Sequence, residues 1–269
     1  MAQDSRTLES RSTDGDVRYS VVGEVATIIL DRPTALNAIN VRLLRGLVDA
    51  VAAAVDDRAV RSIVLTGAGE KAFCAGGDLT ELIPRLTRGE LSILVPDPTK
   101  RFFSDCYKPI VAAVNGLCLA GGLEILLGTD IRVSSATATF GLPEVRWGLV
   151  PGAGTHVRLP QQIPWAISMK LLLTGDHIDA AEAGRHGLVS EVVPVGVDVR
   201  ARAREIATRI AQNSPSAVQT AKEIAVRSLS NEPRFALEFA LNERVLRGPD
   251  ATEGPKAFAE KRLPRYRDL

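Results

Sequence analysis

The sequence predicts an α/β fold whose alternating strands and helices are followed by a purely helical C-terminal region. Short apolar runs typical of buried strands alternate with helical segments up to about residue 194, and only helical periodicity follows. The 269 residues are 45% apolar and 24% charged, which excludes a disordered chain or a fibre. We therefore divide the chain into a leader (1–16), expected to be disordered or loosely docked, a core (17–195) and a helical region (196–269).

The N-terminal part of the core predicts a hairpin, a helix and a buried strand. Residues 18–30 carry β-branched side chains on both sides of a Gly23-Glu24 turn, which is typical of a β-hairpin. Asn40 is a suitable N-cap for a helix that extends to about Asp56, with apolar residues at three-to-four spacing. The apolar run at 61–66 predicts a short buried strand.

The remaining elements follow from apolar runs, prolines and glycines. Residues 78–107 are expected to be helical, with an interruption near Pro96 and Pro98. Gly121 and Gly122 are expected to begin a short apolar helix. Three further strands are expected at 109–115, 130–134 and 190–193. The C-terminal helices are expected at 197–212, 215–230 and 233–247, with a last turn at 253–262.

Composition and charge exclude several classes of function. Lys plus Arg number 33 and Asp plus Glu 32, so the net charge is +1, and aromatic residues are only 4%. We therefore expect neither a nucleic-acid partner nor a membrane role. The three cysteines have no metal-ligand spacing, which predicts no metal site and a reducing, cytoplasmic setting. The polar residues 1–16 contain no apolar segment of a signal peptide.

One glycine motif is interpreted as a surface turn. Residues 67–72 (GAGEKA) follow a predicted strand and match the dinucleotide-binding pattern G-x-G-x-x-[GA]. That pattern must open a helix whose N-terminus holds the pyrophosphate. Here Gly76 and Gly77 follow almost at once and would break the first helical turns.

Two later glycine clusters are candidates for binding a carbonyl oxygen. Gly76-Gly77-Asp78 and Ala120-Gly121-Gly122 each lie between an extended apolar segment and a helical one. Free N–H groups there could converge into an oxyanion hole. Close packing of a helix on a strand explains either cluster equally well.

Two glutamates lie in apolar surroundings. Glu124 is in the first turn of an all-round apolar helix, and Glu144 is flanked by apolar residues and turn formers. Each is either functional or part of a buried ion pair, which for Glu144 would involve Arg146 or Arg132. If functional, two such carboxyls suit acid and base roles at neutral pH. The three histidines are scattered and are interpreted as surface or helix-end residues.

Together, five segments resemble motifs of the enoyl-CoA hydratase/isomerase (crotonase) family over about residues 21–262. In order they are LDRPTALNAIN, KAFCAGGDL, KPIVAAVNGLCLAGGLEI, FGLPEVRWGLVPGAG and EGPKAFAEKR. The resemblance implies a crotonase-like spiral of ββα units, with the C-terminal helical region mediating trimer or hexamer contacts. It also implies an acyl-CoA thioester as substrate and no resident cofactor.

The resemblance assigns roles to individual residues. Glu124 and Glu144 would be catalytic, and the N–H groups of Gly77 and Gly121 would form the oxyanion hole. The residues implied to contact CoA or the substrate are Ala35, Leu36, Ala75, Gly77, Asp78, Leu79, Gly121, Gly152, Phe258 and Lys261. The sequence departs from the family where a common glycine is Thr155, which affects the packing beside the acyl pocket.

The implied function is a 2-enoyl-CoA hydratase in fatty-acid or related acyl-CoA catabolism. Glu144 would give a proton to the α-carbon, and Glu124 would position and deprotonate water. The alternatives are a carnitinyl-CoA-type dehydratase and a Δ3-Δ2-enoyl-CoA isomerase. A non-catalytic acyl-CoA or RNA-binding paralogue is the alternative of a different class, although such relatives tend to lose a carboxylate or gain a basic helix.

Overall fold

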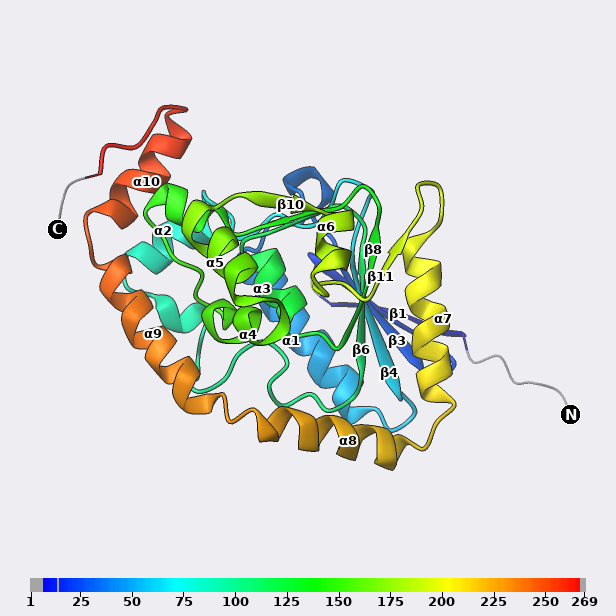
Figure 1. Cartoon of the computed structure of the whole chain (residues 1–269). Coiled ribbons are helices and arrows are strands. Elements are labelled where there is room, and N and C mark those ends of the chain that lie inside the picture. Colours follow the sequence, from blue (N-terminus) through cyan, green and yellow to red (C-terminus); the bar gives the residue numbers. More distant parts are fainter. Residues whose placement is uncertain (1–6, 14, 267–269) are drawn as a thin grey trace, which may run out of the picture.

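The computed structural model describes residues 7–13 and 15–266. Figure 1 shows two β-sheets surrounded by helices, with α8 and α9 extending along the outside of the body. The helices are α1 (Val41–Asp56), α2 (Leu82–Thr87), α3 (Gly121–Leu127), α4 (Thr155–Gln162), α5 (Trp165–Thr174), α6 (Ala180–Arg185), α7 (Val199–Ala211), α8 (Pro215–Ser228), α9 (Glu232–Leu246) and α10 (Asp250–Ala259). Short 3-10 turns are η1 (Pro33–Ala35), η2 (Leu91–Ile93) and η3 (Pro143–Trp147).

The larger sheet has seven strands in the order β1-β2-β3-β4-β6-β8-β11. They are β1 (Thr7–Thr13), β2 (Val17–Val22), β3 (Val25–Leu30), β4 (Ser62–Gly67), β6 (Ile110–Val114), β8 (Ile131–Ser135) and β11 (Glu191–Val193). The expected hairpin is confirmed as the antiparallel pair β2–β3, and the strands from β3 to β11 pair in parallel. Every residue of β4 and β6 is buried, as expected for parallel strands covered on both faces.

A smaller sheet has the strand order β10-β9-β7-β5. Its strands are β5 (Ala72–Cys74), β7 (Leu117–Leu119), β9 (Thr139–Gly141) and β10 (His177–Asp179). Each of β4, β6 and β8 in the larger sheet is followed by a strand of the smaller sheet and then by a helical segment. This recurrence is the expected spiral of ββα units, and it places the ends of β5 and β7 beside each other.

The segment between residues 78 and 107 is less helical than expected. Only α2 and the turn η2 are helical there, and residues 94–107 form a loop. Gly89, with φ +94°, follows the end of α2. Further on, the side chain of Asp97 accepts hydrogen bonds from Thr99, which competes with helical pairing beside Pro98.

The N-terminal leader also differs from the expectation of a disordered or loosely docked segment. Residues 7–13 form β1, which pairs antiparallel with β2 at the edge of the larger sheet. Residues 1–6 lie outside the described part of the chain. The pairing gives the backbone of β2 hydrogen-bond partners on its outer edge.

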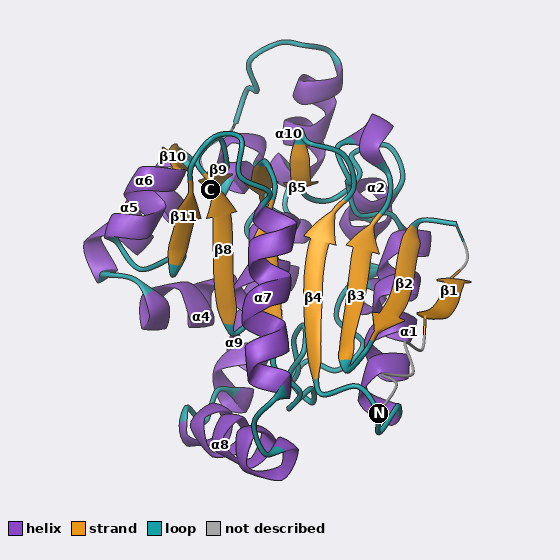
Figure 2. Cartoon of the chain, turned by 90° about the vertical axis from the view of Figure 1, so that its right-hand side faces the viewer, coloured by secondary structure: helices purple, strands orange, loops and turns teal. Residues whose placement is uncertain are grey.

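Helix α7 packs as part of the core, although the sequence places it in the C-terminal helical region. Figure 2 shows α7 lying across the face of the larger sheet. Its buried stripe is mostly alanine and meets valines of β4, β6 and β8. In addition, Ser62 of β4 donates a hydrogen bond to the carbonyl of Ala207 over 2.8 Å. The boundary between the core and the outer helices therefore lies between α7 and α8.

The docking of α7 gives a stability prediction. Ala203 is 0% exposed against the sheet, so Ala203→Leu adds atoms to a filled interior. We expect the free energy of unfolding, measured by urea titration with circular dichroism, to fall by about 1–3 kcal/mol. Ala201→Leu, on the exposed face of the same helix, is the matched control and should change it by less than about 0.5 kcal/mol. Equal losses in the two variants would contradict this packing.

Candidate active site

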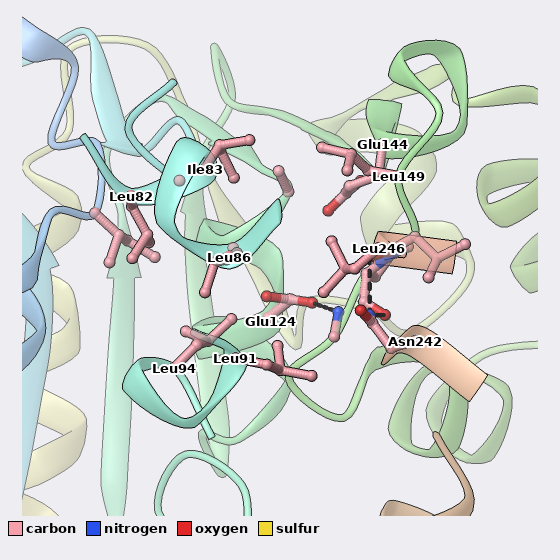
Figure 3. Close-up of a pocket in the computed structure, with 17 residues that line it drawn as sticks. Leu82, Ile83, Leu86, Leu91, Leu94, Glu124, Glu144, Leu149, Asn242 and Leu246 are labelled. Carbon is pink, nitrogen blue, oxygen red and sulfur yellow. Dashed lines mark hydrogen bonds between the residues drawn. The ribbon is translucent and has the colours of Figure 1, made fainter. Parts of the chain in front are cut away.

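An aliphatic cavity of about 80 Å³ lies between α2, α3, η3 and α9. Figure 3 shows leucines from several elements surrounding Glu124 and Glu144. The polar side chains that line it are those of Glu124, Glu144 and Asn242. The other lining residues are Ile39, Gly77, Leu82, Ile83, Leu86, Leu91, Leu94, Ala120, Gly121, Leu149, Val150, Pro151, Gly152 and Leu246. The cavity therefore combines an apolar wall with a few convergent polar groups, as substrate pockets do.

The first expected donor, the N–H of Gly77, is left unpaired by the local backbone pairing. Ile39 donates to the carbonyl of Gly76 over 2.7 Å and accepts from the N–H of Asp78 over 2.8 Å. These two bonds use the carbonyl of Gly76 and the N–H of Asp78, which flank Gly77. In such an extended segment the N–H of Gly77 itself points away from Ile39. Within the described chain the N–H of Gly77 has no hydrogen-bond partner, and Gly77 lines the cavity.

The second expected donor is the first residue of α3. The N–H of Gly121 has no partner within the helix, because the first N–H groups of any helix lie ahead of the first acceptor. A Cβ atom built on Gly121 would lie 3.6 Å from the nitrogen of Gly77, so the two glycines are neighbours. Gly122 instead serves close packing, because a Cβ there would approach the carbonyl oxygen of Cys74 to 2.1 Å. Close packing thus accounts for Gly122, whereas Gly121 leaves its N–H without a helical partner beside Gly77.

Glu124 is a buried carboxylate held by backbone N–H groups. Glu124 is 4% exposed, and its Oε1 atom accepts hydrogen bonds from Gly152 N over 2.6 Å and from Ala153 N over 2.9 Å. Burial raises the pKa of this carboxyl, while the two N–H donors oppose the rise. No ion pair involves Glu124 among the described residues, so the alternative of a buried ion pair does not hold.

Glu144 reaches the same cavity from η3, and its carboxyl has less support. Its Oε2 atom is buried without a hydrogen-bond partner in the described structure. Burial, and then the charge of Glu124, raise the pKa of Glu144 well above its usual value. Glu144 therefore keeps its proton to higher pH than an ordinary glutamate, beside a Glu124 carboxyl that has two hydrogen-bond donors.

The expected ion-pair partners of Glu144 are engaged elsewhere. Arg146 pairs with Asp176 over 2.5 Å. Arg132 donates to backbone carbonyls and to the side chain of Gln162 over 2.7 Å. An ion pair between Glu144 and either arginine is therefore excluded.

Two of the predicted CoA-contacting segments, residues 35–36 and 75–79, lie side by side. The N–H of Ala75 donates to the carbonyl of Leu36 over 3.1 Å, which joins the segment containing Ala35 to the Gly77 loop. Leu79 follows this loop and is half-buried. Asp78 pairs with Arg32 over 3.0 Å and accepts from the backbone and hydroxyl of Thr80. Its carboxylate therefore fastens the loop rather than facing the cavity.

The three C-terminal candidates occupy different positions. Gly152 lines the cavity, but its N–H is donated to Glu124. Phe258 on α10 stacks edge-on against Trp147, with 4.8 Å between ring centroids, and remains 43% exposed. Lys261 lies just beyond α10 and is exposed. The structure thus brings Gly152 to the carboxylates and leaves Phe258 and Lys261 on the surface near η3.

Helix α9 contributes to the site, which the sequence did not predict. Asn242 and Leu246 line the cavity, and Glu238 accepts hydrogen bonds from the N–H groups of Gly154 and His156. These residues share one buried face of α9. Two polar residues on the buried stripe of a helix were the signal that could have revealed them.

Three other expectations concern groups outside this cavity. The GAGEKA segment leads from the end of β4 into β5 rather than into a helix, and its exposed turn is limited to residues 69–71, because Gly67 and Ala68 are buried. No group of three or more His, Cys, Asp or Glu suited to a metal ion occurs in the part of the chain that the structure describes. No helix among the described residues is both long and apolar enough to cross a bilayer.

The raised pKa of Glu144 predicts a stability effect with a definite sign. An acid whose pKa is higher in the folded state binds more protons there, so stability falls as pH rises above the unfolded value of 4.5. Glu144→Gln removes this penalty. We expect it to unfold at a higher temperature than the wild type at pH 7–8, with the difference shrinking toward pH 4. Thermal scans at several pH values test this, and a pH-independent difference would contradict the raised pKa of the Glu144 carboxyl.

Comparison with known proteins shows the family. The family model for enoyl-CoA hydratase/isomerase matches residues 21–269. An enoyl-CoA hydratase of Mycobacterium tuberculosis is 38% identical, covering 91% of this chain and 94% of the relative. A carnitinyl-CoA dehydratase of Proteus mirabilis is 39% identical, covering 91% and 95%. An (E)-benzylidenesuccinyl-CoA hydratase of Thauera aromatica is 38% identical, covering 93% and 98%.

A solved structure agrees with the sequence relatives. The structure of a carnitinyl-CoA dehydratase from Mycobacterium avium superposes with a TM-score of 0.83 at 37% identity, covering 94% of this chain and 98% of the other. The match therefore includes both sheets and the C-terminal helices. The chain belongs to the enoyl-CoA hydratase/isomerase family and has the crotonase fold.

Proposed function

We propose that the protein catalyses the reversible syn addition of water to a 2-trans-enoyl-CoA. The observation that supports this most directly is the arrangement of Glu124, Glu144 and the free N–H groups of Gly77 and Gly121 around one aliphatic cavity. Hydration of a conjugated thioester needs a base, an acid and donors for the carbonyl oxygen. The cavity supplies all three, and the reaction uses no resident cofactor.

The differing environments of the two carboxyls assign their roles. The thioester oxygen would accept hydrogen bonds from Gly77 and Gly121, which stabilise the enolate. Glu124, ionised and held by two N–H groups, would take a proton from water as its oxygen bonds to the β-carbon. Glu144, protonated, would deliver its proton to the α-carbon. The Glu124 proton must then pass to Glu144 or to solvent before the next turnover.

The cavity wall favours a small, neutral aliphatic acyl group. Among the described residues that line it, no aromatic ring could face the quaternary ammonium of carnitinyl-CoA, and no Lys or Arg could bind the free carboxylate of benzylidenesuccinyl-CoA. Its volume of about 80 Å³ is also below the roughly 150 Å³ of an engineered cavity that admits benzene. Isomerisation of a double bond needs one carboxyl to move a proton, whereas hydration uses both.

The surface supports the remaining parts of the proposal. Net charge +1 gives no general attraction for CoA phosphates, so local groups such as exposed Lys261 would hold them. Self-association as a trimer or hexamer is supported by apolar side chains exposed on α8 and α9, where Ile224 is 64% and Leu237 61% exposed. The three buried free cysteines fit a reducing, cytoplasmic setting.

Each carboxyl should be needed for turnover. We expect Glu124→Gln and Glu144→Gln each to lower kcat for crotonyl-CoA hydration by about 10²–10⁴-fold, as is typical for loss of general acid–base catalysis. The measurement is loss of the conjugated thioester absorbance with time. Glu205→Gln, which changes a 66% exposed carboxylate, is the matched control and should keep the wild-type rate. Hydration at near wild-type rate in Glu144→Gln would refute the assigned proton donor.

The choice of substrate can be tested with a panel of thioesters. We expect kcat/KM to be highest for short, unbranched, neutral 2-enoyl-CoAs. Dehydration of carnitinyl-CoA and hydration of benzylidenesuccinyl-CoA should be at least about tenfold less efficient, because their charged groups would be buried without a partner. Product formation followed by liquid chromatography measures each rate. A higher kcat/KM for either charged substrate would show that the aliphatic wall does not set the specificity.

A further inference from the structure

Helix α9 presents two polar side chains to the loop that holds Glu124. Asn242, which is 4% exposed, donates through Nδ2 to the carbonyls of Val150 and Pro151, each over 3.2 Å. One turn earlier, the Glu238 carboxylate accepts from Gly154 N over 2.8 Å. The two contacts lie on either side of residues 152 and 153, whose N–H groups are donated to Glu124.

One peptide group links Asn242 directly to Glu124. The carbonyl of Pro151 and the N–H of Gly152 belong to the same planar unit, so the direction of one fixes the direction of the other. Asn242 holds the oxygen of this unit, and Glu124 accepts its N–H over 2.6 Å. Hydrogen bonds in such a chain also polarise one another.

The packing against Asn242 leaves the peptide little freedom. A Cβ built on Gly152 would lie 2.8 Å from Asn242 Nδ2, so a side chain at residue 152 would separate the two segments. Glu238 is itself fixed, because Arg101 donates to it over 3.0 Å from a fully buried position. The loop is therefore anchored to α9 at two points.

We propose that Asn242 is a positioning residue for the hydration step, which acts by holding the Pro151–Gly152 peptide so that its N–H meets the Glu124 carboxylate. The proposal rests on the proposed function, in which Glu124 activates water. Asn242 lines the cavity and donates to the loop carbonyls of Val150 and Pro151. In this proposal it affects the reaction by orienting the Pro151–Gly152 peptide.

Several charged or titratable groups surround Glu124, and the test must leave them unchanged. Glu144 faces it from η3, Glu238 from α9, His156 from α4 and Cys74 from β5. Asn242→Leu removes the donor, keeps the number and branching of side-chain heavy atoms and adds no charge, so it leaves these groups in place. Weaker support for the carboxylate raises the pKa of Glu124, and the acid limb of the pH–rate profile then moves to higher pH.

The experiment compares wild type, Asn242→Leu and the control Glu243→Gln, which changes a neighbouring exposed ion pair on α9. For Asn242→Leu we expect kcat for crotonyl-CoA to fall about tenfold with KM nearly unchanged, and the acid limb to move up by about 0.5–1 pH unit. Glu243→Gln should keep both values. Titration of the ¹³C-labelled Glu124 carboxyl, assigned by its absence in Glu124→Gln, should show the same shift without requiring turnover.

The outcomes separate this proposal from the proposed function. An unmoved ¹³C titration and acid limb in Asn242→Leu would overturn the positioning role even if kcat fell. A shifted ¹³C titration in a protein that hydrates no enoyl-CoA would support the positioning role and refute the hydratase function. If Asn242→Leu does not fold, Asn242→Ala is measured in the same way, with the same shift expected and the same absence of a shift overturning the proposal.

Discussion

The arrangement of the site depends on burying the Glu124 carboxylate in an aliphatic cavity. Burying an ionised carboxyl is unfavourable unless hydrogen bonds replace its hydration. For Glu124 these come from two consecutive backbone N–H groups, and the loop that supplies them is held by α9. Glu144 lacks such support at Oε2. In the proposed reaction, this difference in backbone support would let two chemically identical side chains act as a base and an acid.

The spiral topology explains why these groups can meet. Successive ββα units place the Gly77 loop after β5 and the start of α3 after β7, and β5 and β7 are adjacent strands of the smaller sheet. The next strand, β9, leads into η3 with Glu144. Three consecutive units therefore bring the Gly77 loop, the start of α3 with Glu124, and Glu144 to the same end of the parallel strands β5, β7 and β9. Helix α9 then closes the cavity with Asn242 and Leu246.

The sequence predicted those parts of the fold and site that have a local cause. Asn40 accepts from Leu43 N and begins α1 as expected, and the two glutamates stood out because their neighbours in the chain are apolar. Whether each glutamate formed an ion pair depended on distant residues, so only the structure answers that question. Asn242 was missed for the same reason, since its partners lie about 90 positions earlier in the chain. Residues 94–107 form a loop that extends beyond the interruption expected near Pro96 and Pro98, where Asp97 accepts hydrogen bonds from Thr99.

The use of α9 as part of the cavity also bears on how the protein is made. Glu124 and Asn242 are 118 positions apart (242 − 124), so the cavity is complete only after α9 has left the ribosome. Contacts of such high sequence separation form late and slow the search for the native state. Nascent chains that still lack α9 would carry both glutamates without the anchored loop. Acyl-CoA binding would thus favour finished molecules, and ligand present during folding would stabilise them selectively by mass action.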